Sequence, residues 1–289
     1  MRLLSALSLL LLLSSHWAAA STAKPLVKQP AKRIVALSPH AVEMLFAIGA
    51  GDTIIATSDS ADFPEEAKVI PRVGGFYGIQ IEKIIELNPD LIVTWKGGNN
   101  VETLDRLTSL GFTLVNSDPK TLADVARDLE RLGQLTGHEA QANKLAKNYR
   151  QQLSLLRQEN AAKADVKVFY QLWSTPLMTV AKNSWIQQII DVCHGQNIFY
   201  AAENEYPQVS VESVLLKAPD VILQSQDEGN IIGIDWSPWH EIPAVINKHI
   251  YQLDADLLHR PSLRTLLGIK TLCDVLDDAR STESTSVVN

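Results

Sequence analysis

The sequence predicts an α/β protein built from two Rossmann-like lobes, each with a mostly parallel central sheet, joined by one long α-helix. The first reason is a repeated passage: residues 79–93 read IQIEKIIELNPDLIV, and residues 209–223 read VSVESVLLKAPDVIL. The passages share an acid, a proline and an aspartate at one offset of 130 residues, as Glu82 and Glu212, Pro89 and Pro219, and Asp90 and Asp220. One repeat at so long an interval indicates two similar lobes, because a solenoid would show many short periods. The second reason is the alternation of short apolar strands with helices, which indicates parallel sheets covered by helices.

The first lobe is predicted to span residues 33–120. It begins with an apolar strand at 33–37, after which Ser38 and Pro39 start a helix. The serine hydroxyl can accept a free backbone N–H, and the proline stands where no N–H is needed. The lobe continues in the same way, with strands at 52–58, 90–95 and 112–117 and helices at 79–88 and 101–111.

A helical connector is predicted at residues 121–163, between the lobes. Its first part reads TLADVARDLERLGQLTG. Its second part, HEAQANKLAKNYRQQLSLLRQENAAK, runs for about 25 residues without an internal glycine or proline, the two residues that most disfavour a helix. A helix of that length between two similar lobes is expected to act as a rigid connector.

The second lobe, residues 164–280, repeats the first loosely. It is predicted to contain a strand at 166–172, a helix at 184–193, the repeat helix with Glu212, a strand at 220–224, and a last strand with its exit loop at 250–256. Residues 225–243 are expected to be irregular, and residues 262–279 to form a closing helix that holds Cys273. The polar tail STESTSVVN, residues 281–289, is predicted to be disordered.

The N-terminus has the pattern of a cleavable signal peptide at residues 1–20. Arg2 precedes the apolar run LLSALSLLLLLSS, and small residues follow at Ala18 and Ala20. The short run and the small residues are typical of a secretory signal cleaved after Ala20 or Ala23; a membrane anchor is the alternative. No cysteine follows for lipid attachment, so the mature chain is predicted to be soluble and exported.

Charge and cysteine content narrow the class of protein. The chain of 289 residues has a formal charge of −7, which becomes −8 when Arg2 leaves with the signal, and it contains no basic run. Such a protein is a poor nucleic-acid binder, but its acidity suits a basic docking partner. Its two cysteines, Cys193 and Cys273, are interpreted as one disulfide in an oxidising compartment, with two buried free thiols as the alternative.

No catalytic motif is present in the sequence. It contains no GxSxG, HExxH, P-loop or strand-following GxGxxG pattern, and no two histidines stand at i,i+4 spacing. The absence of catalytic and metal-ligand spacing argues against an exported enzyme or a metallochaperone. We therefore predict a non-catalytic binding protein, without a cofactor or a metal site, whose ligand lies in the cleft between the lobes.

The loops at the predicted strand ends are rich in aromatic and large apolar side chains. Ligands of open α/β sheets meet the loops at the carboxyl ends of the strands. The residues concerned are Trp95, Leu172, Trp173 and Met178 after strands, and Phe76 and Tyr206 three residues before the two repeats. Aromatic walls suit a large flat ligand, because ring faces bury much area. Ordinary core or surface aromatics are the alternative interpretation.

Glu82 and Glu212 are the second notable set. Both fall in the first turn of a helix, where the helix dipole favours a carboxylate, and this is their structural explanation. One outward-facing acid at the same place in each lobe also suits a two-fold partner that carries arginines. We therefore expect the two acids to dock a partner.

Several segments occur together in this chain: RIVALSPHAVEMLFAIG, WKGGN, the two E-x6-PD repeats, YPQVS and the late cysteine. In this combination residues 33–280 resemble the periplasmic cobalamin-binding proteins, which belong to the bilobal binding proteins with a single connecting helix. The E-x6-PD pattern is shared with siderophore- and haem-binding relatives. The segments WKGGN and YPQVS and the cysteine pair are more specific to the cobalamin-binding proteins.

The resemblance implies a protein that captures cobalamin (vitamin B12) in the periplasm and delivers it to an ABC importer, a permease dimer in the inner membrane. It implies a monomer when free, with cobalamin as transported ligand and not as cofactor. It also implies that Glu82 and Glu212 engage arginines on the permease, and that Cys193 and Cys273 are bonded. The implied ligand-binding residues are Ser60, Phe76, Trp95, Leu172, Met178, Tyr206, Asp256, Leu257, Leu258, His259 and Arg260.

Four of these positions depart from the pattern of the family. Ser60 stands where tyrosine is frequent, Phe76 where tryptophan is usual, and Leu172 and Met178 where phenylalanines are usual. The cleft is therefore expected to stay apolar but to lose aromatic area. Trp173, which has no counterpart in the family, is available to compensate.

A haem- or ferric-siderophore-binding protein of the same fold is the alternative. Haem would need an axial ligand, for which Tyr77, His40 and His259 are the candidates. An anionic siderophore would favour several arginines in the cleft. The cations that the strand-end loops offer are Arg72, Lys96, Lys182 and Arg260.

Overall fold

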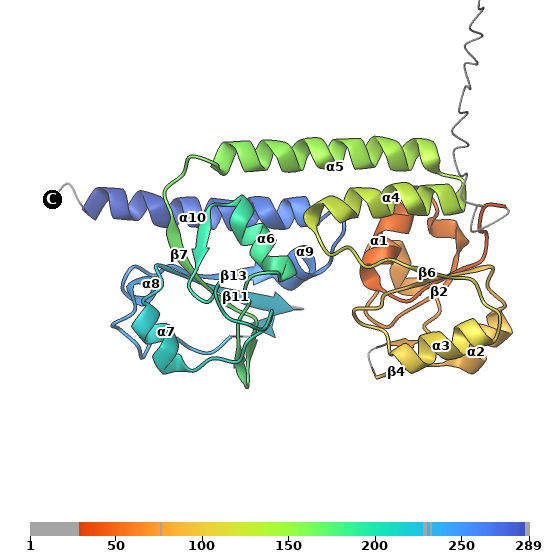
Figure 1. Ribbon diagram of the computed structural model, residues 1–289, viewed down its shortest axis with the longest axis horizontal. Coiled ribbons are helices and arrows are strands. Elements are labelled where there is room, and N and C mark those ends of the chain that lie inside the picture. Colours follow the sequence, from red (N-terminus) through yellow and green to blue (C-terminus); the bar gives the residue numbers. More distant parts are fainter. Residues whose placement is uncertain (1–28, 76, 228–229, 232, 287–289) are drawn as a thin grey trace, which may run out of the picture.

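Two α/β lobes lie side by side beneath a long helix (Figure 1). The computed structural model describes residues 29–75, 77–227, 230–231 and 233–286. The predicted signal peptide with its cleavage site, and Phe76, therefore lie outside the described residues. None of the helices in the described part of the chain is long and apolar enough to cross a membrane.

The first lobe is a parallel sheet flanked by helices. Its strands are β1 (Ile34–Ala36), β2 (Ile54–Thr57), β3 (Gly74–Gly75), β4 (Gly78–Ile79), β5 (Leu91–Thr94) and β6 (Leu114–Asn116). Its helices are α1 (Pro39–Ala47), α2 (Ile81–Leu87) and α3 (Val101–Ser109), with short 3-10 helices η1 (Gly51–Thr53) and η2 (Glu65–Val69). The sheet order is β2-β1-β5-β6, all parallel, and β3 pairs with β4 as a separate hairpin. Every residue of β1 and β5 is buried, as expected for strands covered by helices on both faces.

The second lobe repeats this plan with additions. Its strands are β7 (Val166–Gln171), β8 (Trp173–Ser174), β9 (Leu177–Met178), β10 (Gly195–Asn197), β11 (Val221–Asp227), β12 (Asn230–Ile231) and β13 (Ile250–Asp254). Its helices are α6 (Trp185–Val192), α7 (Val211–Lys217), α8 (Pro243–Ile246), α9 (Ala255–His259) and α10 (Thr265–Ser286). Strands β10, β7, β11 and β13 lie parallel in that order, and β12 pairs antiparallel with the end of β11. The predicted fold class is confirmed.

Two helices between the lobes, α4 (Leu122–Thr136) and α5 (Glu139–Asn160), pack against each other. Gly137 adopts a left-handed φ of 75°, which ends α4 and allows α5 to run back toward the second lobe. Figure 1 shows α5 running along one side of the molecule, above α4 and part of α10. One continuous apolar cluster contains residues of both sheets and of these helices, among them Val93, Leu129, Tyr149 and Val168. The two lobes thus share an interior beneath the connector.

The repeated passage forms the same structure in each lobe. Helices α2 and α7 begin and end 130 residues apart, and each is followed by a left-handed residue, Asn88 with φ 44° and Ala218 with φ 45°. Asp90 then accepts backbone N–H groups from the residues just before β1 at 2.9 and 3.1 Å, and Asp220 accepts one from β7 at 2.9 Å. Each aspartate therefore fastens the start of one strand to the neighbouring parallel strand. The aspartate of the pattern is therefore explained by these hydrogen bonds, whereas the glutamate at its start is exposed in the first turn of each helix.

The predicted disulfide is confirmed, since Cys193 and Cys273 are bonded. Cys193 lies at the end of α6 and Cys273 within α10, and both residues are buried. The Arg280 guanidinium donates to the carbonyl oxygens of Cys193 at 2.8 Å and His194 at 3.1 Å. Helix α10 is therefore fastened to the end of α6 by a covalent bond and by two hydrogen bonds.

The predicted disordered tail is wrong for residues 281–286, because α10 continues to Ser286. Residues 287–289 lie outside the described part of the chain. The tail contains no glycine or proline to end a helix, and Arg280 pairs with Asp277 one turn earlier at 2.7 Å. The polarity of the tail was therefore a weaker signal than the absence of a helix-ending residue.

Two smaller predictions in the second lobe also need correction. The stretch 225–243 is not irregular throughout, because β11 extends to Asp227 and β12 returns beside it. The predicted exit loop after β13 is instead the first turn of α9. The Asp254 side chain accepts the backbone N–H of Asp256 at 2.8 Å and so caps this helix.

Candidate functional site

A cavity of about 330 Å³ lies between the two lobes. The loop after β2 forms its wall in the first lobe, and the end of β11 and helix α9 form its wall in the second. The lining residues are Asp59, Ser60, Asp62, Asp227, Ala255, Asp256, His259 and Arg260. The cavity thus lies beyond the carboxyl ends of β2, β11 and β13, where open α/β sheets place their ligands.

A second cavity of about 120 Å³ adjoins Trp95 in the first lobe, and Ser60 lines both cavities. The Trp95 ring is held firmly, because its Nε1–H donates to Asp118 at 3.1 Å and the His40 ring meets it edge-on. A Cβ atom at Gly98 would overlap the Trp95 ring. The WKGGN segment therefore has a steric reason: the glycine lets the loop fold closely against the indole.

Ser58 lines this smaller cavity, and its buried hydroxyl has no hydrogen-bond partner among the described residues. Ser58 is 7% exposed. A buried hydroxyl without a partner costs roughly 1–3 kcal/mol, so a polar group of a ligand placed here would gain a hydrogen bond. No sequence pattern singled out Ser58, since a serine after a strand is common in any loop.

The structure does not bring every predicted ligand-binding residue to these cavities. Leu172, Met178 and Tyr206 line neither of them. Leu172 precedes β8 and Met178 ends β9; the Leu172 N–H donates to the Met178 carbonyl oxygen at 2.9 Å, and both residues are half-buried. Tyr206 is 41% exposed and Trp173 is 49% exposed. Contact of these side chains with a ligand stays a prediction.

The segment 256–260, predicted as a ligand-contacting loop, is mostly the helix α9. Residues three and four positions apart share one face of a helix, so Asp256, His259 and Arg260 line the larger cavity while Leu257 and Leu258 do not. The Leu258 side chain is 1% exposed and packs into the core. The Leu258 side chain is therefore turned away from the cavity, and contact of this residue with a ligand stays a prediction.

The two histidines considered as haem ligands are buried and hydrogen-bonded. Burial lowers the pKa of His40 and of His259 to about 4, so both rings are neutral at pH 7. His40 Nε2 lies 3.0 Å from the Ser117 carbonyl oxygen, and His259 Nε2 lies 2.8 Å from the Tyr170 hydroxyl. Each of these nitrogens already has a protein partner, which disfavours the haem alternative. Tyr77, the third candidate, is fully exposed.

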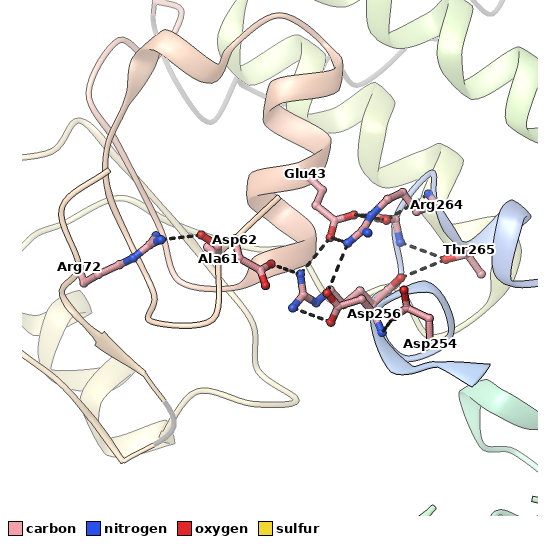
Figure 2. A network of polar contacts seen from close by, with 10 residues as sticks. Glu43, Ala61, Asp62, Arg72, Asp254, Asp256, Arg264 and Thr265 are labelled. Carbon is pink, nitrogen blue, oxygen red and sulfur yellow. Dashed lines mark hydrogen bonds and ion pairs between the residues drawn. The ribbon is translucent and has the colours of Figure 1, made fainter. Parts of the chain in front are cut away.

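A cluster of ion pairs joins the two lobes beside the larger cavity (Figure 2). Glu43 of α1 is buried in the first lobe and accepts two hydrogen bonds from Arg264 of the second, at 3.0 and 2.5 Å. The Ser262 hydroxyl donates to the same carboxylate at 2.5 Å. The Arg264 guanidinium also lies over the Phe63 ring, 4.0 Å from its centre. This part of the cluster is a buried cross-lobe anchor that we call the Glu43 anchor.

The other part of the cluster centres on Arg260, which lines the cavity. Its Nη1 lies 2.5 Å from Asp62 and 3.4 Å from Glu43, and its Nη2 lies 2.6 Å from Asp256. Burial raises the pKa of Asp256 to about 6, because the attraction of Arg260 is offset by burial and by the charges of Asp62 and Asp254. As the pH falls through about 6, the Asp256 carboxyl becomes protonated, and its ion pair with Arg260 is replaced by a hydrogen bond from the charged guanidinium to an uncharged carboxyl.

Sequence reasoning missed Glu43, Asp62 and Arg264. Glu43 carried a usable signal, since it is the single charge within the apolar helix segment AVEMLFAIG and a buried charge needs a partner. Asp62 and Arg264 carried none, because their partners lie 198 and 221 residues away along the chain.

Replacing Glu43 by glutamine should lower the free energy of unfolding by roughly 3 kcal/mol, because it leaves the Arg264 guanidinium largely buried without its counter-charge. Urea unfolding of the purified protein measures this change. The matched control is Glu130→Gln, which removes an exposed two-hydrogen-bond pair with Arg150 and should cost under about 1 kcal/mol. Equal urea midpoints for Glu43→Gln and the control would show that the Glu43 anchor stabilises the protein no more than an exposed ion pair does.

Glu82 and Glu212 do not belong to this cluster. Both side chains are exposed, in the first turns of α2 and α7. Figure 1 shows these two helices on the side of the molecule opposite α5. Hydrogen bonds from its own backbone N–H and from Ser210 lower the pKa of Glu212, which keeps this carboxylate ionised. The two acids thus form a matched pair on one side of the protein, one on each lobe.

The sequence model of the periplasmic binding protein family matches residues 34–257, so the chain belongs to that family. The protein is therefore a substrate-binding protein and not an enzyme. The "Vitamin B12-binding protein" of Vibrio vulnificus strain CMCP6 is 42% identical over 246 residues, which cover 85% of this chain and 90% of that relative. The crystal structure of the periplasmic vitamin B12 binding protein BtuF of Vibrio cholerae has a TM-score of 0.80 and 40% identity, over 87% of this chain and 98% of that one.

Haem-binding proteins share this fold at lower sequence similarity. The periplasmic haem-binding protein BhuT has a TM-score of 0.78 but only 21% identity, over 86% of this chain and 99% of that one. This likeness shows a common fold and carries no information on the ligand.

Proposed function

We propose that the protein captures cobalamin between its two lobes in the periplasm and delivers it to an ABC importer of the inner membrane. The observation that carries the proposal is the cavity at the strand ends, bounded by both lobes and continued at Ser60 by the cavity beside Trp95. The similarity to vitamin B12-binding relatives over most of the chain supports the choice of ligand.

The described residues suit both the flat macrocycle of a corrinoid and the amide side chains around it. Trp95 offers an indole surface to the flat macrocycle, since its ring is fixed and partly exposed. Ser58, Ser60, Asp256 and Arg260 offer hydroxyl, carboxylate and guanidinium groups to the amide side chains around its rim. Cobalamin is then a transported ligand, and its cobalt keeps its own ligands without a protein residue.

Delivery in this proposal depends on Glu82 and Glu212. One carboxylate on each lobe, on the side away from α5, would meet arginines on the two subunits of a permease dimer. The two-fold symmetry of such a dimer matches the two-lobed repeat of this chain. We propose that the free protein is a monomer.

Titration of the purified protein with cyanocobalamin should show binding with a submicromolar dissociation constant, which corresponds to more than about 8 kcal/mol. Isothermal calorimetry measures it directly, and quenching of tryptophan fluorescence gives an independent reading. Hemin is the control ligand, because haem-binding proteins share the fold. Heat with hemin and none with cyanocobalamin would reverse the assignment.

A further inference from the structure

Asp62 and Arg260 form an ion pair that crosses between the lobes at the wall of the larger cavity. The Asp62 carboxylate lies 2.5 Å from Arg260 Nη1, and both residues line the cavity. Asp62 comes from the loop after β2, whereas Arg260 follows α9. The pair therefore joins the two walls between which the ligand would lie.

The Asp62 loop is held in place by the rest of the first lobe. Arg72 donates to the carbonyl oxygen of Ala61, the residue before Asp62, at 2.7 Å, as Figure 2 shows. The next residue, Phe63, supports the Arg264 guanidinium on its ring. Both neighbours of Asp62 are thus fixed, so its carboxylate reaches Arg260 from a rigid base.

Arg260 is held from both lobes. Asp256, four residues earlier, binds Nη2 at 2.6 Å, and the Thr265 hydroxyl donates to the Arg260 carbonyl at 3.1 Å. Asp62 binds Nη1 from the first lobe. The Arg260 side chain is only 12% exposed, whereas the Asp62 side chain is 38% exposed, so the pair has a buried end and an end open to the cavity.

The Asp62–Arg260 pair differs in this respect from the neighbouring Glu43 anchor. Glu43, Ser262 and Arg264 do not line the cavity, and the Glu43 side chain is 3% exposed. The anchor therefore has a structural role, as the stability prediction above states. Asp62 is the first-lobe carboxylate that both lines the cavity and pairs with Arg260.

We propose that Asp62 is a positioning residue for the ligand site, which acts through Arg260 by holding its guanidinium across the lobe boundary. This proposal rests on the proposed function. In it, the Arg260 guanidinium, oriented jointly by both lobes, binds amide groups of the ligand. Burial tends to raise the pKa of Asp62, but the hydrogen bond and charge of Arg260 outweigh it and keep the pKa below its ordinary value. The carboxylate is therefore ionised at the pH of binding, as a positioning role requires.

The test is a double-mutant cycle read out as cyanocobalamin affinity. Asp62→Asn and Arg260→Gln should each raise the dissociation constant about five- to tenfold, and the double variant should be no weaker than the weaker single variant, because the two residues act as one unit. Asp62→Glu restores a carboxylate and should recover part of the affinity. The control Glu66→Gln removes an exposed charge four residues along the chain and should bind as the wild type does.

A merely structural role of Asp62 would give a different result. Asp62→Asn would then lower the melting temperature of the free protein while affinity, measured well below that temperature, stayed at the wild-type value. Two results would overturn the positioning role but not the proposed function. One is wild-type affinity in Asp62→Asn together with weakened binding in Arg260→Gln. The other is strictly additive losses of affinity in the double variant. A wild-type protein that binds no cyanocobalamin would instead overturn the proposed function, and this inference with it.

Discussion

Replacing both Glu82 and Glu212 by arginine should abolish delivery of cobalamin to the importer while capture remains intact. The two side chains are exposed, on helices that do not line either cavity, so the dissociation constant for cyanocobalamin should stay within about twofold of the wild-type value. Each truncated charge pair in an interface costs roughly 2–5 kcal/mol, and reversal adds repulsion between arginines. Uptake of labelled cobalamin into importer-containing proteoliposomes should therefore fall at least about 100-fold, since each 1.4 kcal/mol corresponds to a factor of ten.

The matched control reverses two other exposed glutamates, Glu139 and Glu159, at the two ends of α5. It changes the net charge of the protein equally but alters the side opposite α2 and α7 (Figure 1). Uptake with this control should remain near that of the wild type. Transport by the Glu82/Glu212 variant at the rate of the control would remove the docking role from both residues.

Removing the disulfide with Cys193→Ala and Cys273→Ala should lower the free energy of unfolding by about 4–5 kcal/mol. The bond closes a loop of 80 residues, and the chain-entropy model assigns this much to a loop of that length. Alanine is preferred to serine, because both positions are buried and a hydroxyl there would need a new hydrogen-bond partner. Urea unfolding followed by circular dichroism measures the difference.

Reductant supplies the control for this experiment. Unfolding of the wild-type protein in the presence of dithiothreitol should approach the curve of the double alanine variant, whereas dithiothreitol should leave that variant's curve unmoved. Coincident curves for the wild type and the variant under oxidising conditions would show that the bond contributes no stability.

The features predicted best from the sequence were those that depend on a short local pattern or on the internal repeat. The offset of 130 residues identified α2 and α7 in advance, because a left-handed cap followed by PD is a short-range pattern that two lobes use in the same way. The disulfide was predicted equally well, since two cysteines in an exported chain allow only one pairing. Trp95 was singled out because loops after parallel strands converge at one edge of a sheet, whereas Ser60 came from the resemblance to the cobalamin-binding family; both line the smaller cavity.

The predictions that failed, and the residues that were missed, depend on tertiary structure or on one helical turn. Leu258 was assigned to a loop, but a single turn of α9 directs its side chain into the core. The cross-lobe contacts of Glu43, Asp62 and Arg260 join residues about 200 positions apart, for which no local pattern exists. Such contacts become visible only when both lobes are in place.

The interior that the lobes share beneath α4 and α5 limits how this protein can be re-engineered for another cargo. Exchanging one lobe for that of a relative would require the foreign lobe to fit helices that belong to neither half alone. A mismatch there would leave voids in the centre of the molecule, at a cost of several kcal/mol. Under the proposed function, substitutions of cavity-lining residues such as Ser58 and Ser60 would therefore alter selectivity more readily than grafting whole halves.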